Sequence, residues 1–194
     1  ESVLEPRWDA DGTLYFISDR SGWWNLYRWR GREPEPVVLM TAELAEPLWN
    51  LGQVNYVLAG DGRAVVRYGT EARDRLAIVD LSTGKLRTIE LPFVSYSGLG
   101  LLRSAGQVLS IAASPTAEPA VVAIDLHTYA CRVLRAAGQA PLDAAHISAA
   151  ESIEYPTAGG LTAHAFYYPP VNPAYTAPPG EKPPLVVKVH GGPT

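Results

Sequence analysis

The residues of this chain whose types and spacing could serve chemistry are His190-Gly191-Gly192-Pro193, which directly follow the apolar run Leu185–Val189. Glycine adopts backbone geometry that other residues resist, so the amide N–H groups of two adjacent glycines can face a ligand without an intervening Cβ. Such amides stabilise the negative oxygen of a tetrahedral intermediate, and losing one costs about 3 kcal/mol of transition-state stabilisation. A tight turn after a strand also favours glycine, so the motif alone leaves both interpretations open.

The elements that must position this motif precede it in the chain. Leu185–Val189 is apolar at four of its five positions, which predicts a central strand covered on both faces. Residues 169–184 hold seven prolines and should be irregular. Before them, residues 152–155 and 161–168 flank a Gly-Gly turn, and we expect an antiparallel hairpin there.

A repeat occupies the chain before this point. Gly12, Gly62 and Gly106 each stand in a turn that precedes an apolar run, at spacings of 50 and 44 residues. A polar loop and a second strand follow each of these runs. The second strands of the last two repeats end in Asp-Leu-x-Thr, at Asp80–Thr83 and Asp125–Thr128. The Glu-Pro-x-Trp sequences at Glu5–Trp8 and Glu46–Trp49 echo one another as well.

The repeats predict about four short strands each. The expected strands are 13–17, 25–29, 37–40, 54–59, 64–68, 76–81, 86–91, 99–103, 108–111, 120–126 and 132–134. Four strands in about 45 residues is the unit of a propeller blade, which must stack on its neighbours to bury both faces. A β-sandwich is the alternative, and the shared order of turn, strand, loop and strand favours the propeller.

We therefore expect a mainly β protein. Residues 1–140 are assigned to a partial β-propeller of about three four-stranded blades, and residues 141–152 to a linker. Residues 153–194 are assigned to the N-terminal hairpin and strand of an α/β-hydrolase domain, because the loop after the third strand of that fold carries a His-Gly-Gly type motif. Propellers close with four to eight blades, so either further blades lie upstream or several chains complete the ring together, and we expect the former.

Composition and charge argue against several classes of function. The net charge is −4 with no block of like charges, which argues against nucleic-acid binding. The longest apolar runs are only a few residues, too short to span a membrane. Cys131 is the only cysteine, which fits a cytoplasmic protein. The four histidines show no metal-ligand spacing, and we expect neither a metal nor a cofactor.

With these motifs in place, the chain resembles the prolyl oligopeptidase family, and most closely its acylaminoacyl-peptidase-like and dipeptidyl-aminopeptidase-like branch. The resemblance covers essentially the whole chain. It is carried by residues 8–29, 153–170 and 190–193. It implies a serine peptidase that hydrolyses short peptides through a Ser-His-Asp triad lying beyond this chain, with a propeller that restricts access to the active site.

Carried onto this sequence, the resemblance makes Gly191 and Gly192 backbone donors of the oxyanion hole, with Gly192 the better match, and gives His190 a supporting role. The triad serine of this fold sits in a Gly-x-Ser-x-Gly elbow, a motif that the sequence lacks, so we expect this chain to be inactive by itself.

Two other functions remain open. The first is a non-catalytic β-propeller binding module, although a pure propeller would have no use for the hairpin and the His-Gly-Gly-Pro segment. The second is a compact esterase, against which the repeats argue, because such enzymes alternate strands with helices. The expected partner is a short peptide substrate, and open sheet edges could also promote self-association.

Overall fold

The computed structural model describes residues 1–49, 51–138, 142–189 and 191. It divides into two compact units, Glu1–Ala140 and Pro141–Thr194, and each is described by itself. The described residues form strands and three short 3-10 helices, η1 (Arg103–Ala105), η2 (Ala144–His146) and η3 (Ala158–Gly160). In this described part of the chain, no helix is long and apolar enough to cross a bilayer.

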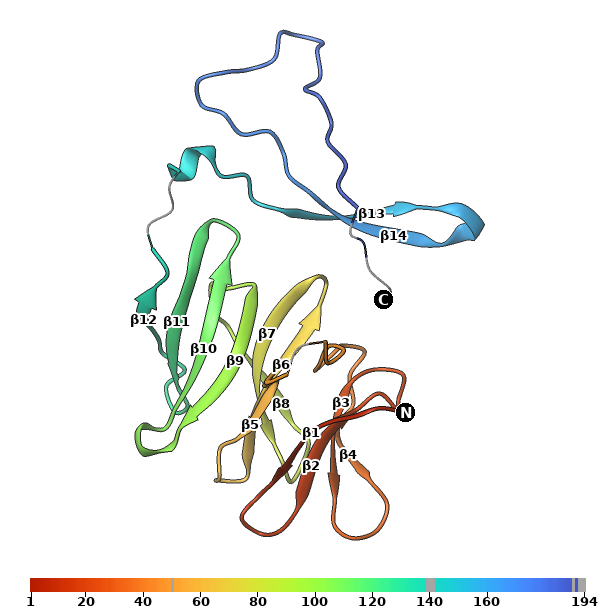
Figure 1. The fold of residues 1–194 in the computed structure, drawn as a ribbon, viewed down its shortest axis with the longest axis vertical. Coiled ribbons are helices and arrows are strands. Elements are labelled where there is room, and N and C mark those ends of the chain that lie inside the picture. The colour runs from red at the N-terminus through yellow and green to blue at the C-terminus, as the bar shows by residue number, and fades with distance from the viewer. Residues whose placement is uncertain (50, 139–141, 190, 192–194) are drawn as a thin grey trace. The chain divides into compact units, whose positions relative to one another are not determined.

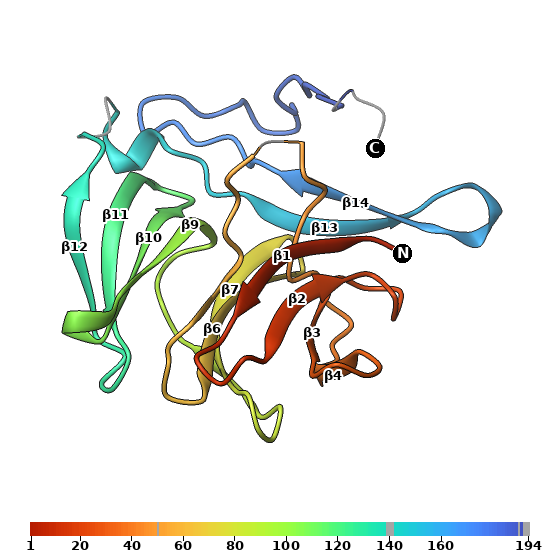
Figure 2. The same cartoon turned by 60° about the horizontal axis from the view of Figure 1, so that its bottom comes forward.

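The first unit consists of three antiparallel four-stranded sheets, which confirms the predicted partial propeller (Figures 1 and 2). Blade 1 contains β1 (Val3–Trp8), β2 (Leu14–Ser18), β3 (Asn25–Trp29) and β4 (Glu35–Val38). Blade 2 contains β5 (Tyr56–Leu58), β6 (Arg63–Thr70), β7 (Arg73–Asp80) and β8 (Leu86–Ile89). Blade 3 contains β9 (Ser95–Leu102), β10 (Gln107–Ser114), β11 (Ala117–Asp125) and β12 (Cys131–Ala136). In each blade the strands pair in chain order.

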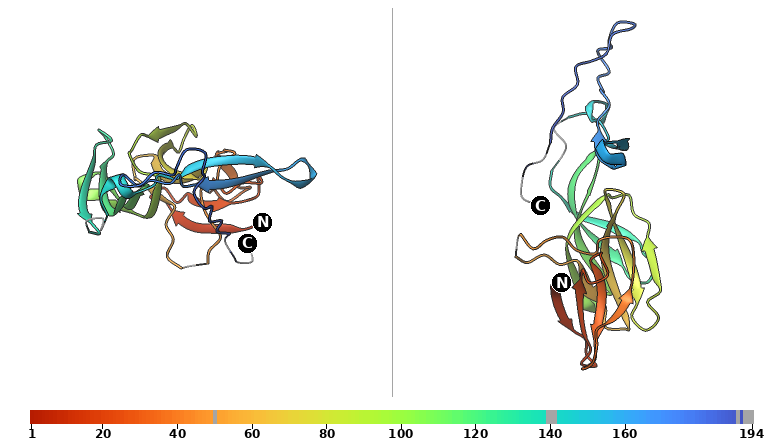
Figure 3. Two further views of the ribbon diagram at one scale, coloured as in Figure 1. Left: turned by 90° about the horizontal axis from the view of Figure 1, so that it is seen from above. Right: turned by 90° about the vertical axis from the view of Figure 1, so that its right-hand side faces the viewer.

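Blade 2 is buried on both faces because it packs between the other two blades (Figure 3). Val66 of β6 packs with residues of blade 1, and Val65 packs with residues of blade 3. Consecutive side chains of a strand point to opposite faces, so this one apolar run serves two cores. Burying each valine contributes about 1.5–3 kcal/mol. Burial on both faces explains why residues 64–66 of β6 and 76–79 of β7 form continuous apolar runs rather than alternating ones.

The first strand of blade 1 was not among the predicted strands. Pro6 removes a ladder donor and is tolerated in sheets at edges and bulges. In β1 the register shifts between Leu4 and Arg7, and Glu5 has a positive φ of 50°. The bulge therefore accommodates the proline. The similar sequence Glu46–Trp49 does not form a strand, because it lies in the loop between blades 1 and 2.

The Asp-Leu-x-Thr repeat forms the same turn in blades 2 and 3. Oδ1 of Asp80 accepts from the backbone N–H groups of Ser82 and Thr83 at 3.0 and 2.9 Å. Oδ1 of Asp125 likewise accepts from the N–H of Thr128 at 2.8 Å. Such Asp-to-backbone bonds close turns on the strand that ends there, and the motif is therefore structural.

The next position in each turn has a positive φ, 70° at Gly84 and 61° at Tyr129. A Cβ at Gly84 would collide with the carbonyl oxygen of Val37, so this turn requires glycine for space as well as for conformation.

The second unit contains the expected hairpin. Strands β13 (Glu151–Pro156) and β14 (Thr162–Tyr167) pair in continuous antiparallel register. Gly159 and Gly160 both adopt positive φ in the turn between them. Upstream, the carboxylate of Asp143 accepts from the N–H of Ala145 and caps η2, so the predicted linker contains one short helical turn.

The prediction of a buried strand at Leu185–Val189 is wrong for this structure. These residues lie outside any strand, and Leu185, Val186, Val187 and Val189 are 73–88% exposed. A central strand needs a hydrogen-bonded neighbour on each edge and a layer on each face. Among the described residues of the second unit, the only sheet is the β13–β14 hairpin, which does not pair with this run. The assignment of residues 153–194 to a hydrolase domain stays a prediction.

Candidate functional site

The predicted oxyanion segment is only partly described by the structure. His190 and Gly192 lie outside the described residues. Gly191 is exposed and outside secondary structure, and an added Cβ there would meet no atom within 4 Å. Because the structure describes only one of these three residues, their role in an oxyanion hole stays a prediction.

Within the first unit, the most unusual charged group is the buried Arg67 of β6, whose side chain is 10% exposed. Its Nη1 donates to Oε1 of Glu46 at 3.1 Å, and the same nitrogen lies 3.7 Å from Oδ2 of Asp74. Its Nε is buried and has no hydrogen-bond partner among the described residues. Two carboxylates around one guanidinium give this cluster a net charge of about −1, because arginine stays protonated at neutral pH.

A cleft of about 260 Å³ lies beside this cluster, and we call it the Glu46 cleft. Its lining comprises Glu46, Leu51, Gly52, Gln53, Val54, Asn55, Arg67, Tyr96, Ser97 and Gly98. The Glu46 side chain is 62% exposed although Arg67 holds it. A carboxylate that is fixed on one side and open on the other can accept hydrogen bonds from a protonated amine.

Neighbouring polar groups fix the wall of the cleft. The carboxylate of Glu5 accepts from the backbone N–H of Asn55 at 2.9 Å and from its Nδ2 at 2.6 Å. The fully buried Tyr56 places its hydroxyl 2.7 Å from the carbonyl oxygen of Glu5 and 2.9 Å from that of Tyr15. Burial raises the pKa of Tyr56 well above its ordinary value, so the hydroxyl stays a donor. Glu5 of blade 1 thus holds Asn55, and Tyr56 ties the start of blade 2 to blade 1.

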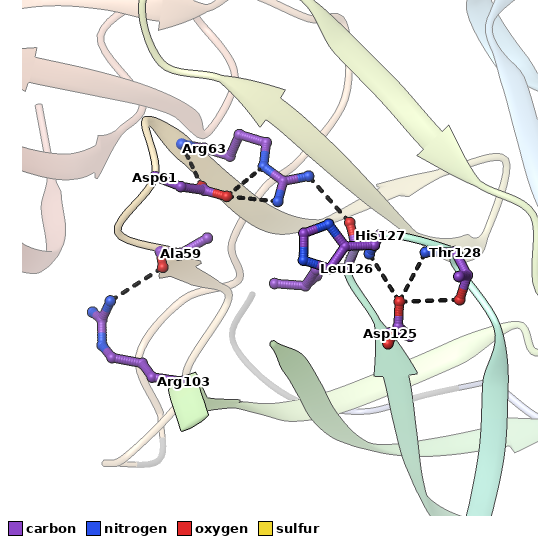
Figure 4. Close-up of polar contacts among 8 residues, drawn as sticks. All are labelled: Ala59, Asp61, Arg63, Arg103, Asp125, Leu126, His127 and Thr128. Carbon is purple, nitrogen blue, oxygen red and sulfur yellow. Dashed lines mark hydrogen bonds and ion pairs between the residues drawn. The ribbon is translucent and has the colours of Figure 1, made fainter. Parts of the chain in front are cut away.

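Arginine side chains form hydrogen bonds between neighbouring blades (Figure 4). Nη1 of Arg63 donates to the carbonyl oxygen of Leu126 at 3.1 Å, and Arg63 also pairs with Asp61. Arg28 makes the corresponding bond from blade 1 to the carbonyl oxygen of Leu81 at 3.0 Å. In the opposite direction, Arg103 donates to the carbonyl oxygen of Ala59 at 3.2 Å. The acceptors Leu81 and Leu126 are the leucines of the two Asp-Leu-x-Thr turns.

Among the described residues, other reactive residue types do not gather into a site. The described residues contain no group of three or more His, Cys, Asp or Glu side chains placed to hold a metal ion. His164 pairs with Glu154 across the hairpin at 3.4 Å, with both side chains exposed. Burial raises the pKa of the Cys131 thiol, which lowers its nucleophilicity.

Sequence reasoning missed the Glu46–Arg67–Asp74 cluster. One signal was present, because Arg67 interrupts the apolar run of β6, and a charge in a buried strand requires a partner. The identity of that partner depends on the loop between blades 1 and 2 folding back over β6. No spacing in the sequence reports this arrangement.

In sequence comparisons, no protein-family profile and no curated protein matches the chain. Solved structures do match. A puromycin hydrolase aligns with a TM-score of 0.86 and 29% identity, over 94% of this chain and 28% of its own. A Mycobacterium tuberculosis puromycin-hydrolyzing peptidase aligns with a TM-score of 0.86 and 34% identity, over the same shares.

A structure from a study of two prolyl endopeptidases aligns with a TM-score of 0.65 and 16% identity, over 84% of this chain and 23% of its own. At that identity the last likeness shows the fold alone. The chain spans about 28% of the length of the puromycin hydrolases that it matches.

Proposed function

Because this chain belongs to the prolyl oligopeptidase family, we propose that it is the propeller part of a serine peptidase that hydrolyses short peptides, by acylaminoacyl or dipeptidyl release. The observation that carries this proposal is the 34% identity and TM-score of 0.86 to a puromycin-hydrolyzing peptidase over 94% of the chain. Three stacked blades alone would fit a binding module equally well. The likeness to peptidases favours the enzyme.

The proposed catalytic machinery lies mostly beyond the chain. The sequence contains no Gly-x-Ser-x-Gly elbow, so we assign the nucleophile and its two triad partners to residues after Thr194. Gly191 and Gly192 are proposed to donate their N–H groups to the oxyanion, with His190 orienting their loop. The support is the motif itself, in which two glycines follow an apolar run.

For the propeller, we propose that the Glu46 cleft receives the amino group of a peptide. The cluster carries a net charge of about −1, and the carboxylate of Glu46 is open to solvent on one side. A hydrogen bond to a charged group contributes about 1.5–3 kcal/mol. Glu46→Gln in the longer protein should therefore raise KM at least about tenfold for substrates with a free amino group, and should leave N-acylated substrates unaffected.

The experiment that tests the function compares two proteins, the longer protein that contains this sequence and the 194-residue chain. Both are assayed on puromycin, on an acyl-peptide reporter and on a dipeptide reporter. We expect hydrolysis by the longer protein alone. Failure of a correctly folded longer protein to cleave any of the three would support the binding module instead. The ratio between reporters then decides between acylaminoacyl and dipeptidyl release.

A further inference from the structure

Asn55 lines the Glu46 cleft at the start of blade 2, and only 5% of its surface is exposed. All but one of its polar atoms have partners. Its backbone N–H and its Nδ2 donate to the carboxylate of Glu5, and its carbonyl oxygen accepts from the backbone N–H of Arg67 at 2.8 Å. The remaining atom, the side-chain oxygen Oδ1, has no hydrogen-bond partner among the described residues.

This side-chain oxygen is not enclosed by protein. Among the described residues, the buried side-chain nitrogen and oxygen atoms that lack a partner are Nε of Arg7 and Nε of Arg67. Oδ1 of Asn55 is not one of them, so this atom reaches solvent. Because Asn55 is otherwise almost fully buried and lines the Glu46 cleft, this cleft is the opening through which Oδ1 can be reached.

Glu5 sets the orientation of the Asn55 amide. The Glu5 side chain is 6% exposed and pairs with Arg7 at 3.5 Å. An ionised carboxylate only accepts hydrogen bonds, so the amide must turn its Nδ2 toward Glu5 and its Oδ1 away from it. The distance from Nδ2 to Oε1 of Glu5 is 2.6 Å. The opposite orientation would place two acceptors against each other and would lose this bond.

The bulge in β1 brings the Glu5 carboxylate to Asn55. The register of β1 shifts between Leu4 and Arg7, and the φ of Glu5 is 50°. Bulges redirect side chains, which regular pleating would point alternately to the two faces of the sheet. The bulge therefore serves a second purpose besides accommodating Pro6, because it supplies the carboxylate that holds the amide.

Glu46 and Asn55 flank the same arginine. Nη1 of Arg67 donates to Oε1 of Glu46 at 3.1 Å, while the backbone N–H of Arg67 donates to the carbonyl oxygen of Asn55. Both acceptor-bearing residues line the cleft. The cleft thus combines a charged acceptor, the carboxylate of Glu46, with a neutral one, the fixed amide oxygen of Asn55.

From these observations, and resting on the amine site proposed above, we propose that Oδ1 of Asn55 is a second acceptor for the ammonium group of the ligand. The Glu46 cleft would then select amines that carry at least two N–H bonds. Glu46 neutralises the charge and accepts one N–H, Asn55 accepts another, and Glu5 is the positioning residue that orients the amide. Primary and secondary ammonium groups satisfy both acceptors. A tertiary ammonium keeps the charge but has a single N–H, so it leaves Asn55 without a donor.

Calorimetric titration of the 194-residue chain with Ala-Phe amide, a ligand with an ammonium group and no carboxylate, tests the proposal. N,N-dimethyl-Ala-Phe amide keeps the positive charge with one N–H, and we expect it to bind about tenfold more weakly than the free amine. N-methyl-Ala-Phe amide has two N–H bonds, and we expect its affinity to stay within about threefold of the free amine. Equal binding of the free and dimethylated ligands would overturn the proposal. An equal loss with each added methyl group would indicate bulk alone and would also contradict it.

The variant Asn55→Ala tests the protein side. We expect it to bind the free amine about tenfold more weakly and to bind the free and dimethylated ligands within about threefold of each other. A preference for the free amine as large as in the unaltered chain would contradict the role of Asn55. Asn172→Ala is the matched control, since Asn172 is an exposed asparagine outside the cleft, and it should keep the full preference. Circular dichroism reports whether each variant is folded, and the ligand series on the unaltered chain decides if Asn55→Ala is not.

Glu46→Gln separates this proposal from the amine site on which it rests. We expect this variant to weaken the binding of both the free and the dimethylated ligand, because both carry the charge that Glu46 neutralises. No effect of Glu46→Gln would show that the amine site is wrong, and the second acceptor with it. Weaker binding by Glu46→Gln together with equal binding of the two ligands by the unaltered chain would refute the role of Asn55 alone. Hydrolysis is not measured, so neither result depends on peptidase activity.

Discussion

Nη1 of Arg63 donates a hydrogen bond to the carbonyl oxygen of Leu126 at 3.1 Å, across the junction between blades 2 and 3. Arg28 and Leu81 repeat this relationship between blades 1 and 2 at 3.0 Å. In both cases the acceptor is the leucine of an Asp-Leu-x-Thr turn. The repeated motif therefore connects each blade to the one before it, in addition to closing its own turn.

Replacing Arg63 with methionine should lower the free energy of unfolding of the first unit by about 1–2 kcal/mol, because a charged donor to a backbone carbonyl is lost. The Arg63 side chain is 26% exposed, so solvent replaces the bond only in part. Urea unfolding followed by tryptophan fluorescence measures the change. Arg132→Met on the exposed face of β12 is the control and should stay within about 0.5 kcal/mol of the unaltered chain. Equal stabilities of the two variants would show that the interblade bond contributes nothing.

Tyr56→Phe should destabilise the chain by about 1–2 kcal/mol, because it removes a buried hydroxyl that bonds the carbonyl oxygens of Glu5 and Tyr15. The aromatic ring, and its contact with Arg7, would be kept. Thermal and urea unfolding measure the effect. Tyr175→Phe is a matched control, since Tyr175 is 80% exposed. A Tyr56→Phe chain as stable as this control would show that the two carbonyl groups find other partners.

Acid should weaken the turn closed by Asp80. Hydrogen bonds from Ser82 and Thr83 lower the pKa of Asp80 from 3.8 to about 2. In the window between these two values the unfolded chain binds more protons than the folded chain, so the contribution of Asp80 is present above pH 3.8 and is lost as the pH falls to about 2. Urea unfolding at pH 5, 3.5 and 2.5 should show a smaller loss for Asp80→Ala than for the unaltered chain. The same loss in both would exclude Asp80 as a source of acid sensitivity.

Ala72 has a left-handed backbone conformation (φ 58°) in the β6–β7 turn, so Ala72→Gly should stabilise this hairpin. A left-handed conformation costs an L-residue about 1–2 kcal/mol, whereas the greater flexibility of glycine costs about 0.5–1 kcal/mol. The expected net gain is about 0.5–1 kcal/mol, seen as a higher Tm. Glycine at Ala105, which lies in the 3-10 helix η1, is the control and should lower stability. A fall in Tm for Ala72→Gly would mean that the alanine methyl group packs favourably in the turn.

Much of the blade structure could be predicted from the sequence, because glycine turns and apolar runs are local signals. The strand expected at residues 25–29 is the observed β3. The strand β1 was missed because Pro6 argues against a strand, and only the structure shows the bulge that accommodates it. The apolar run Leu185–Val189 indicates that burial would be favourable, and the structure leaves it exposed and unpaired.

The charged sites were less predictable for a related reason. The Glu46–Arg67–Asp74 cluster joins a loop to two strands. These contacts arise when blades stack and connections fold across them, so residue spacing carries little information about them. The His190-Gly191-Gly192 motif is the converse case, being clear in sequence and mostly outside the described residues.

The central claim is tested most directly by labelling with a serine-directed fluorophosphonate, with the labelled residue identified by peptide mass spectrometry. The longer protein and the 194-residue chain are treated side by side. The account predicts one labelled serine in the longer protein, located after Thr194 within a Gly-x-Ser-x-Gly sequence, and no label on the 194-residue chain. Labelling of a serine within residues 1–194, or a folded longer protein that takes up no label, would contradict it.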